Sequence, residues 1–367
     1  MKRIVVLVLT ILLIVAACSK KEPAPETPTP TPVVTASPPP TAMPTPEPTP
    51  EPTPEPTPTP LPYINGLTGI RSEVDTSANR PFAIMINNIS LAQPQCGIGE
   101  ADIIYEILAE GGITRMLAFF SDLDGIGPIG SMRSIRSYFI DIATAYDAIV
   151  VHAGGSDQAY YDISSKGINN IDGVRGAYGA EIFYRDPNRM SGGYEHSLFT
   201  TSERILEYLP KFNYRTEHEG GSFDYGLSFV DDPAPVIGDS ASTVNVSFDG
   251  HKTSYFTYNL ESGKYNMRQY NADYIDGNTD ELLGFDNLLI LYAQTSTIDG
   301  YGRLSVVTTG SGNGHYVNGG KAEDITWARE NSNTSFNYSL PNGSKLELFS
   351  GKTYICIVPT GSAITFG

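Results

Sequence analysis

The pattern of apolar and polar positions in this 367-residue chain changes along its length. After Pro62, short apolar runs are separated by turn residues, and the run from Phe82 to Asn87 has the length of a buried strand. Residues 103–110 and 113–120 predict a hairpin, because the glycine pair between them supplies the positive φ angles of a two-residue turn. The first folded segment therefore begins with β-structure.

Helical and strand patterns then alternate. The spacing of apolar positions predicts a helix over 133–146, a strand over 148–152 and a helix over 157–164. A capping box from Thr200 to Glu203 predicts the start of another helix. This order of elements is typical of an α/β domain, in which helices flank a mixed sheet.

After residue 242 the pattern is almost purely that of strands. Short runs rich in Thr, Tyr and Val are separated by Gly, Asn and Asp turns, which favours an antiparallel barrel or sandwich. Residues 310–321 predict a glycine-rich hairpin and not a phosphate loop, since no helical pattern follows them. We predict the α+β class, with an N-terminal α/β domain (63–210), a connector (211–241) and a C-terminal antiparallel β-rich domain (242–367).

The first 17 residues have the features of a secretory signal. Lys2 and Arg3 precede an apolar run from Ile4 to Val15, which is too short to span a bilayer comfortably. The small residues before Cys18 resemble the lipobox of bacterial lipoproteins. That resemblance implies cleavage before Cys18 and a diacylglycerol on its sulfur, with the protein anchored outside the cytoplasm. An ordinary cleaved signal with an incidental cysteine is the alternative.

Residues 18–62 predict a disordered stalk. Of the 27 prolines in the chain, 18 fall between Glu22 and Pro62, mostly in repeated Thr-Pro and Glu-Pro units. Such a segment favours an extended polyproline conformation and could reach on the order of 100 Å. The predicted role is a spacer that holds the folded part away from the membrane.

The charge balance bears on the partners. Residues 63–367 contain 20 basic and 36 acidic side chains, a net charge of −16. This acidity argues against nucleic acid and against a polyphosphate-coated surface as the main partner. The cysteines Cys96 and Cys356 are far apart in sequence and we expect them unpaired. No zinc-type spacing of Cys and His is present, and no cofactor is predicted.

Charged residues interrupt the apolar hairpin. With a two-residue turn, residue 108 pairs with 115 and residue 106 with 117, which would place Glu106, Glu110 and Arg115 on one face of the hairpin. This face predicts either a structural ion-pair cluster or the polar floor of a site. In the second case either glutamate is a candidate acid or base.

Two arginines follow the glycine-rich loop 122–132. Arg133 and Arg136 would share one face of the opening helix and form an anion pocket there, or pair with nearby carboxylates. Arg185 and His196 fall in later loops, which suits binding residues. We therefore predict a ligand site that includes Arg115, Arg133, Arg136, Arg185 and Ser156.

His152 and Ser156 lie where a strand gives way to a helix. Ligands bind at such strand ends in α/β sheets, so His152 is a candidate for acid–base chemistry, as is His196. The alternative for His152 is a hydrogen-bonded core residue. Ser156 is placed to cap the following helix.

The central block resembles a known family. RPFAIMINN, PQCGIGEADIIYEILAEGGITRMLAFF, IGPIGSMRSIRSYFIDIATAYDAIVVHAGGS, the YRD of 184–186 and a late GxG…GGK…ITWAR are similar to the YerB-like bacterial lipoproteins. The resemblance implies a cell-envelope lipoprotein with paired N- and C-terminal domains and no established activity. The family's Pro-His-Asn trio is replaced here by Glu195-His196-Ser197.

The sequence leaves three functions open. The first is an envelope protein whose N-terminal domain binds an anionic polymer or a cell-wall glycan. The second is a hydrolase or transferase that acts on a wall polymer or a lipid-linked phosphate, with catalytic residues drawn from Glu106, Glu110, His152 and His196. The third is a scaffold for a protein partner.

Overall fold

The computed structural model describes residues 60–231 and 236–367. The predicted signal segment, Cys18 and the stalk up to residue 59 lie outside the described residues. Among the described helices, none combines the length and apolar character that crossing a membrane requires.

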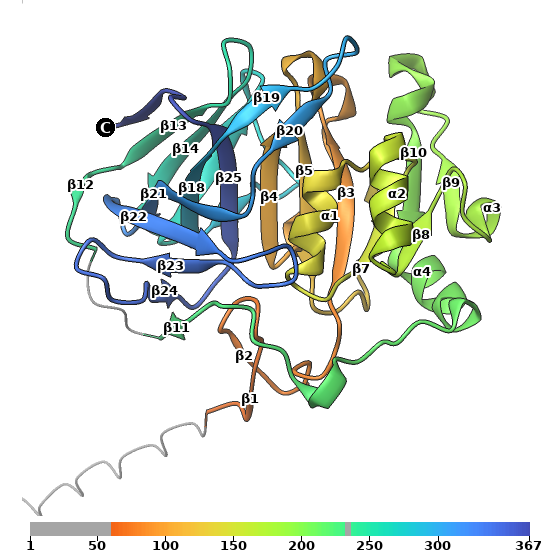
Figure 1. Cartoon of the computed structure of the whole chain (residues 1–367), viewed down its shortest axis with the longest axis horizontal. Helices are drawn as coiled ribbons and strands as arrows, with labels where there is room; N and C mark the ends of the chain where they lie inside the picture. The colour runs from red at the N-terminus through yellow and green to blue at the C-terminus, as the bar shows by residue number, and fades with distance from the viewer. Residues whose placement is uncertain (1–59, 232–235) are drawn as a thin grey trace, which may run out of the picture. The chain divides into compact units, whose positions relative to one another are not determined.

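An eleven-stranded mixed sheet forms the centre of the structure (Figure 1). Ten of its strands follow one another across the sheet, and β23 (Asn337–Ser339) pairs with β22 beside this path. The order is β12 (Asp239–Ser240), β22 (Lys321–Arg329), β21 (Gly310–Asn318), β18 (Asn287–Ala293), β25 (Thr353–Pro359), β4 (Ile103–Leu108), β5 (Thr114–Phe120), β3 (Phe82–Asn88), β7 (Ile149–His152) and β8 (Asn170–Asp172).

Strand β25 joins the two halves of the chain. It runs parallel to β4 on one side and parallel to β18 on the other. Its residues from Thr353 to Val358 are all buried, because a strand between parallel neighbours is covered on both faces. The two predicted domains thus share one sheet, and their boundaries stay predictions.

A separate antiparallel sheet lies in the C-terminal region. Its burial alternates along the strands, as in β14, because one face packs on the core and the other meets solvent. The order is β16 (Ala272–Asp273), β15 (Lys264–Gln269), β14 (Thr253–Asn259), β13 (Thr243–Ser247) and β26 (Ile364–Phe366), with β17 (Gly284–Phe285) beside β15.

The remaining strands form four smaller sheets. One has the order β6 (Pro128–Gly130), β10 (Leu198–Thr201), β9 (Phe183–Arg185), and three are pairs. The pairs are β1 (Tyr63–Ile64) with β2 (Arg71–Ser72), β11 (Phe229–Val230) with β24 (Leu348–Phe349), and β19 (Thr295–Thr297) with β20 (Leu304–Val306).

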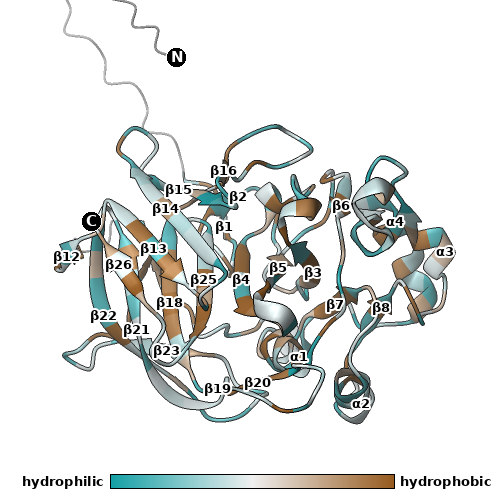
Figure 2. Cartoon of the chain, turned by 90° about the horizontal axis from the view of Figure 1, so that it is seen from above, coloured by the Kyte–Doolittle hydropathy of each residue, from teal (hydrophilic) through white to brown (hydrophobic). Residues whose placement is uncertain are grey.

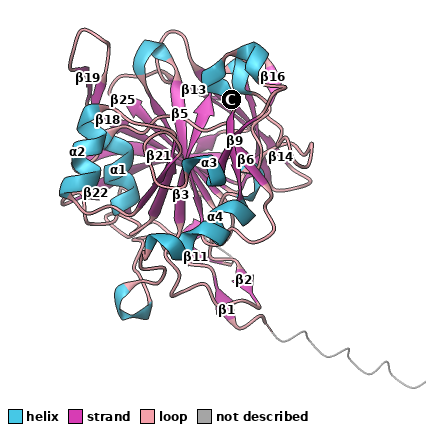
Figure 3. Cartoon of the chain, turned by 90° about the vertical axis from the view of Figure 1, so that its right-hand side faces the viewer, coloured by secondary structure: helices cyan, strands magenta, loops and turns pink. Residues whose placement is uncertain are grey.

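The helices are short. They are α1 (Ser137–Thr144), α2 (Asp157–Ser165), α3 (Gly179–Ile182) and α4 (Ser202–Tyr208). Single 3₁₀ turns occur at Ser90–Ala92, Ile98–Glu100, Glu110–Gly112, Met190–Gly192, Tyr194–His196, Leu209–Phe212 and Glu219–Gly221. Figure 3 shows α1 and α2 side by side on one flank of the strands. The fold is therefore the predicted mixture of α and β structure.

Each face of the large sheet has its own apolar core. Tyr105, Phe119 and Phe139 belong to the core that packs against α1. Ile84 and Phe256 belong to the core on the other face, beneath the separate antiparallel sheet. Figure 2 shows that sheet and the two helices on opposite sides of the large sheet. Covered faces explain why β3, β4 and β5 are buried throughout.

The hairpin forms as predicted, but its register differs by one residue. Ala109 N donates to Ile113 O at 2.7 Å, so three residues and not two make the turn. Its last two members, Gly111 and Gly112, have φ of 75° and 70°, which suits glycine. The extra turn residue pairs Glu106 with Met116 and Ile107 with Arg115. Glu106 and Arg115 therefore lie on opposite faces, and the prediction of one shared charged face is wrong.

Helix α1 also starts later than predicted. Arg136 is its N-cap in an extended conformation, with φ −127° and ψ 158°. The residues before it pair with neighbouring backbone instead, since Arg133 N donates to Met85 O and Ile135 N to Gly154 O. Pairing with the sheet outweighs the helical pattern here, so Arg133 and Arg136 do not share a helix face.

Candidate functional site

A half-buried carboxylate holds two of the predicted arginines together. Glu110 in the hairpin turn accepts from Arg136 Nη2 at 3.0 Å and from Arg115 Nη2 at 3.2 Å, and Arg136 Nε also donates to it. Arg115 crosses to the loop before α1, where Nη1 donates to Ser134 O at 2.6 Å. The three-residue turn allows Arg115 and Arg136 to contact the same carboxylate, because it puts Arg115 on the α1 side of the sheet.

The surroundings fix the charges in this group. Burial by itself would raise the pKa of Glu110, but the Arg136 hydrogen bond and the charges of Arg115 and Arg136 outweigh it and lower the pKa. Burial lowers the pKa of Arg115 to about 10, which leaves it a cation at neutral pH. Glu110 is thus a carboxylate at neutral pH and has no proton to supply as a general acid.

Arg133 lies next to this pair and is bound differently. Its Nε is buried and has no hydrogen-bond acceptor among residues 60–231 and 236–367. Burial lowers the pKa of Arg133, while the charge of Glu195 raises it. Glu195 is a weak counterion because 57% of its side chain is exposed.

His196 lies beside Arg133. Asn87 Nδ2 is 3.0 Å from His196 Nδ1, which suits an imidazole that accepts at Nδ1 and carries its proton on Nε2. Burial and the charge of Arg133 lower the pKa of His196, although Glu195, with Oε1 3.6 Å from Nε2, opposes this. His196 is therefore neutral at neutral pH.

Arg185 also lies near Glu195. Its guanidinium stacks over the Tyr194 ring, 3.8 Å from the ring centroid, and Nη1 donates to Tyr194 O. Together with His196 and Arg133, it helps to lower the pKa of Glu195, whose own backbone hydrogen bond is the largest cause. We call Arg115, Arg133, Arg136 and Glu110 the arginine cluster; Arg185 is outside it.

Ser156 lies at the edge of the arginine cluster. Its side chain accepts from Ala159 N at 3.2 Å, so it caps α2 as the sequence predicts. It also lines a shallow recess of about 380 Å³ with Arg136, Tyr301 and Arg303. Tyr301 and Arg303 come from the turn between β19 and β20, and the sequence pattern offered no signal for them.

Glu106 is not near the arginine cluster. It is fully buried on the opposite face of β4, where Thr114, Ser254 and Tyr354 donate to it at 2.6, 2.8 and 2.7 Å. Lys252 Nζ lies 3.1 Å from its Oε1. A carboxylate enclosed in this way contributes to the fold and is not exposed to a substrate.

His152 is also enclosed, with no exposed surface. Its Nδ1 lies 2.8 Å from Gly154 O and its Nε2 lies 3.2 Å from Asn170 Oδ1. Both ring nitrogens are therefore engaged within the core. The structure brings His196 to the predicted ligand residues and leaves Glu106 and His152 apart from them.

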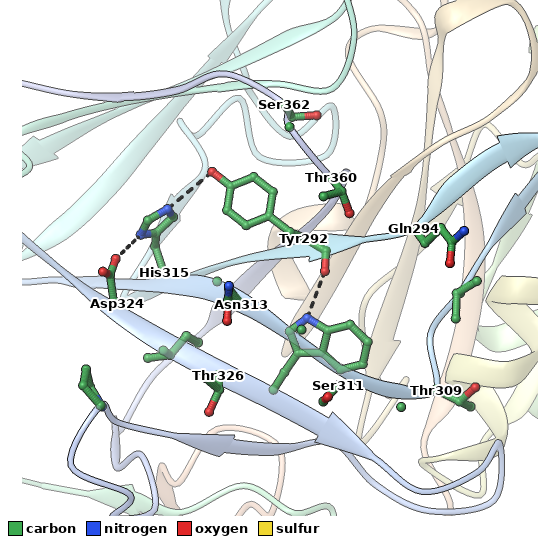
Figure 4. A pocket seen from close by; sticks show the side chains of 18 residues that line it. Tyr292, Gln294, Thr309, Ser311, Asn313, His315, Asp324, Thr326, Thr360 and Ser362 are labelled. Atoms are coloured by element: carbon green, nitrogen blue, oxygen red, sulfur yellow. Dashed lines mark hydrogen bonds and ion pairs between the residues drawn. The ribbon is translucent and has the colours of Figure 1, made fainter.

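A larger hollow lies in the C-terminal half, and the sequence analysis did not predict it. This groove of about 950 Å³ lies over β18, β21 and β22 and the loop after β25 (Figure 4). His315 lies between Tyr292 and Asp324, with 2.9 Å from Nδ1 to Asp324 Oδ1 and 3.4 Å from Nε2 to the Tyr292 hydroxyl. The sequence feature that marks this groove is the alternation of glycine with Ser311, Asn313 and His315 in the predicted hairpin.

Comparison with known families identifies the chain. Residues 67–215 match the N-terminal domain, and residues 244–355 the C-terminal domain, of the protein of unknown function DUF3048. The chain belongs to the DUF3048 family. This confirms the resemblance seen in the sequence.

Two relatives support the assignment of this DUF3048 protein. YerB of Bacillus subtilis strain 168, provisionally named as a lipoprotein, is 27% identical over 298 residues, or 80% of this chain and 85% of that protein. The crystal structure of Bacillus subtilis YerB superimposes with a TM-score of 0.69 at 26% identity, covering 82% of this chain and 99% of that one. Neither name states a reaction or a ligand.

The chemistry open to this DUF3048 protein follows from the side chains that it groups together. Within residues 60–231 and 236–367, no three His, Cys, Asp or Glu side chains are grouped as metal ligands. Cys96 and Cys356 are both unpaired. The arginine cluster offers positive charge and hydrogen-bond donors, which is the chemistry of anion binding.

Proposed function

We propose that this DUF3048 protein is a membrane-anchored protein of the cell envelope that binds an anionic group of an envelope polymer at Arg133. The observation that carries the proposal is the buried Nε of Arg133, which lacks an acceptor among the described residues. A buried donor left unpaired costs about 1–3 kcal/mol, so a ligand oxygen that accepts from it would gain affinity. A phosphate or carboxylate offers such an oxygen.

The local charge supports an anion in preference to a cation. Arg115 and Arg136 both donate to one half-buried carboxylate, Glu110. Arg133 lies near this carboxylate and near the exposed Glu195. This excess of positive charge occurs in a chain whose net charge is −17. This local positive charge would attract an anion although the chain as a whole is acidic.

The alternatives are less well supported. A glycan would bind here through its carboxylate or phosphate groups, and the uncharged His196 could donate to it from Nε2. For an enzyme, the enclosed positions of Glu106 and His152 leave Glu110 and the largely buried His196 as the remaining candidates. Glu110 with its lowered pKa would act only as a base or as a counterion.

The proposed lipid anchor is inferred from the sequence around Cys18 and from the similarity to YerB. Cys18 follows a signal-like segment, and YerB is provisionally named as a lipoprotein. A diacylglycerol on Cys18 would hold the folded part outside the cytoplasm, at the end of the proline-rich stalk. This location would bring the arginine cluster within reach of wall polymers.

Sedimentation with purified wall sacculi tests the ligand. The full chain in detergent is mixed with sacculi that carry or lack their anionic polymers. Wild type should sediment only with the former, and Arg133→Gln should weaken binding about tenfold, as expected for the loss of one hydrogen bond to a charged group. Arg175→Gln is the matched control, since it removes an exposed arginine from the same half of the chain.

The outcomes separate the three functions. Equal sedimentation of wild type and Arg133→Gln would overturn the assignment of Arg133. No binding to either kind of sacculus would refute the anionic ligand and favour a protein partner. Release of soluble polymer fragments by wild type would favour an enzyme.

A further inference from the structure

The groove in the C-terminal half lies over a part of the large sheet where polar side chains are exposed along β21 and β22. Along β21, Ser311, Asn313 and His315 alternate with glycines. On the neighbouring β22, Asp324 pairs with His315 and Thr326 with Asn313, so their side chains share this face. The sheet thus presents a row of hydrogen-bonding side chains along the groove.

Two glycines of β21, Gly312 and Gly314, lie where a side chain would collide with neighbouring residues. A Cβ at Gly312 would lie 2.6 Å from Trp327 Nε1, and a Cβ at Gly314 would lie 2.5 Å from Ile290 O. Trp327 therefore packs directly against Gly312, and its Nε1 donates to Tyr292 O at 3.1 Å. The glycine-rich sequence is a packing requirement, which explains why it resembles a phosphate loop without acting as one.

The lining of the groove is nearly free of charge. None of the residues that line it is a lysine or an arginine, and its one carboxylate, Asp324, is paired with His315. Hydroxyl and amide side chains supply the remaining polarity, among them Gln294, Asn313 and Thr360, which Figure 4 labels. Because no cationic side chain lines this groove, the groove does not suit an anion. The ligand of the groove therefore differs in chemistry from the ligand of the arginine cluster.

Tyr292 supplies an oriented aromatic ring. His315 Nε2 lies 3.4 Å from its hydroxyl, and Asp324 fixes the other side of the imidazole. Burial and the charge of Asp324 raise the pKa of Tyr292, so the phenol keeps its proton and is not a nucleophile. A held ring beside hydroxyls and amides suits the apolar face and the hydroxyl groups of a sugar.

We propose that this groove binds a neutral oligosaccharide. Its volume of about 950 Å³ is within the range of about 300–1,000 Å³ typical of ligand pockets. Asn313, Ser311 and Thr326 would exchange hydrogen bonds with sugar hydroxyl or acetamido groups, while Tyr292 packs on a sugar ring. This site is separate from the anion site at Arg133 and does not depend on it.

The single tryptophan of the chain reports on the groove. Trp327 lines it and touches the backbone of Tyr292, so a bound sugar should change its emission. The full chain in detergent is titrated with oligomers of N-acetylglucosamine and of glucose, and calorimetry records binding independently. Saturable binding with a parallel emission change is the expected result.

Two variants locate the binding. Asn313→Ala removes an exposed groove amide and should weaken binding about tenfold, because each lost hydrogen bond reduces affinity by up to about that factor. Asn337→Ala removes an exposed asparagine of β23, outside the groove, and should leave affinity unchanged. Arg133→Gln should also leave it unchanged, which separates this test from that of the anion site.

Three results would overturn the proposal. The first is that calorimetry and emission both show no binding of either oligosaccharide. The second is equal affinity in wild type and Asn313→Ala. The third is an emission response to an uncharged extended peptide in place of the sugars, which would assign the groove to a polypeptide.

Discussion

Replacing Lys252 with methionine tests whether a buried ion pair holds the two halves of the chain together. Lys252 Nζ lies 3.1 Å from Glu106 Oε1 and donates to Ser254 and Gln269 at 2.8 Å each. Glu106 belongs to β4, and Lys252 lies just before β14 in the separate antiparallel sheet. Both side chains are at most 2% exposed.

The expected cost follows from this burial. Removing one partner of a buried pair leaves the other charge uncompensated, which costs about 3–5 kcal/mol. Since whole domains are stable by only about 5–15 kcal/mol, Lys252→Met should lower the free energy of unfolding by a large fraction. Glu106→Gln/Lys252→Met should recover about 1–3 kcal/mol, because the unpaired charge is then gone.

Urea unfolding provides the assay. Far-UV circular dichroism follows all of the secondary structure, while Trp327 emission follows β22 at the far side of the sheet. Both transitions should move together, since β25 joins the two halves. Lys264→Met is the control: Lys264 is 40% exposed and 3.7 Å from Asp286, so its loss should cost at most about 1 kcal/mol.

A stabilising role of the buried ion pair is refuted if Lys252→Met lowers the free energy of unfolding no more than Lys264→Met does. It also fails if circular dichroism shifts while the tryptophan transition does not, because the two halves would then unfold separately.

Two further predictions concern acid stability and the anchor. Burial alone would raise the pKa of Asp147, but hydrogen bonds from His218 and Arg215 and the charges of Arg80 and Arg215 lower it to about 2. A carboxylate whose pKa is lower in the folded state stabilises the protein at pH values above its unfolded pKa, which is near 4. The free energy of unfolding of wild type should therefore exceed that of Asp147→Asn by about 2 kcal/mol at neutral pH, and this difference should vanish as the pH falls toward about 2. If the difference in free energy of unfolding between the two proteins, measured by urea, stays constant from neutral pH down to about pH 2, the prediction is refuted. Cys18→Ser should move the protein from the membrane fraction to the soluble fraction on cell fractionation, and retention in the membrane would exclude a lipid anchor at Cys18.

Local patterns in the sequence determined most of the individual elements. The strands at 82–88, 103–108, 114–120 and 149–152 follow from apolar runs between turn residues. Ser156 caps α2 as predicted, whereas α4 is capped by Thr201 and not by Thr200. These features depend on residues within a few positions of one another, which is why the sequence shows them.

Tertiary structure decided how charged residues are grouped. One additional turn residue moved Arg115 to the α1 side and left Glu106 on the other face. The partner of Glu106, Lys252, is far away in the sequence, and no local pattern links the two. Backbone pairing of Arg133 and Ile135 also replaced the predicted start of the helix. Arg136 therefore meets Arg115 at Glu110 and does not share a helix face with Arg133.

The sequence by itself therefore determined the family, the class of fold and the residues from which a site could be built. The tertiary structure decided which of them share a surface, and it created the groove beside Tyr292 from strands and a loop far apart in the chain. The physical reason is that hydrophobic periodicity is a local property. Register, burial of charge and the shape of a hollow depend on long-range pairing, which only the folded chain supplies.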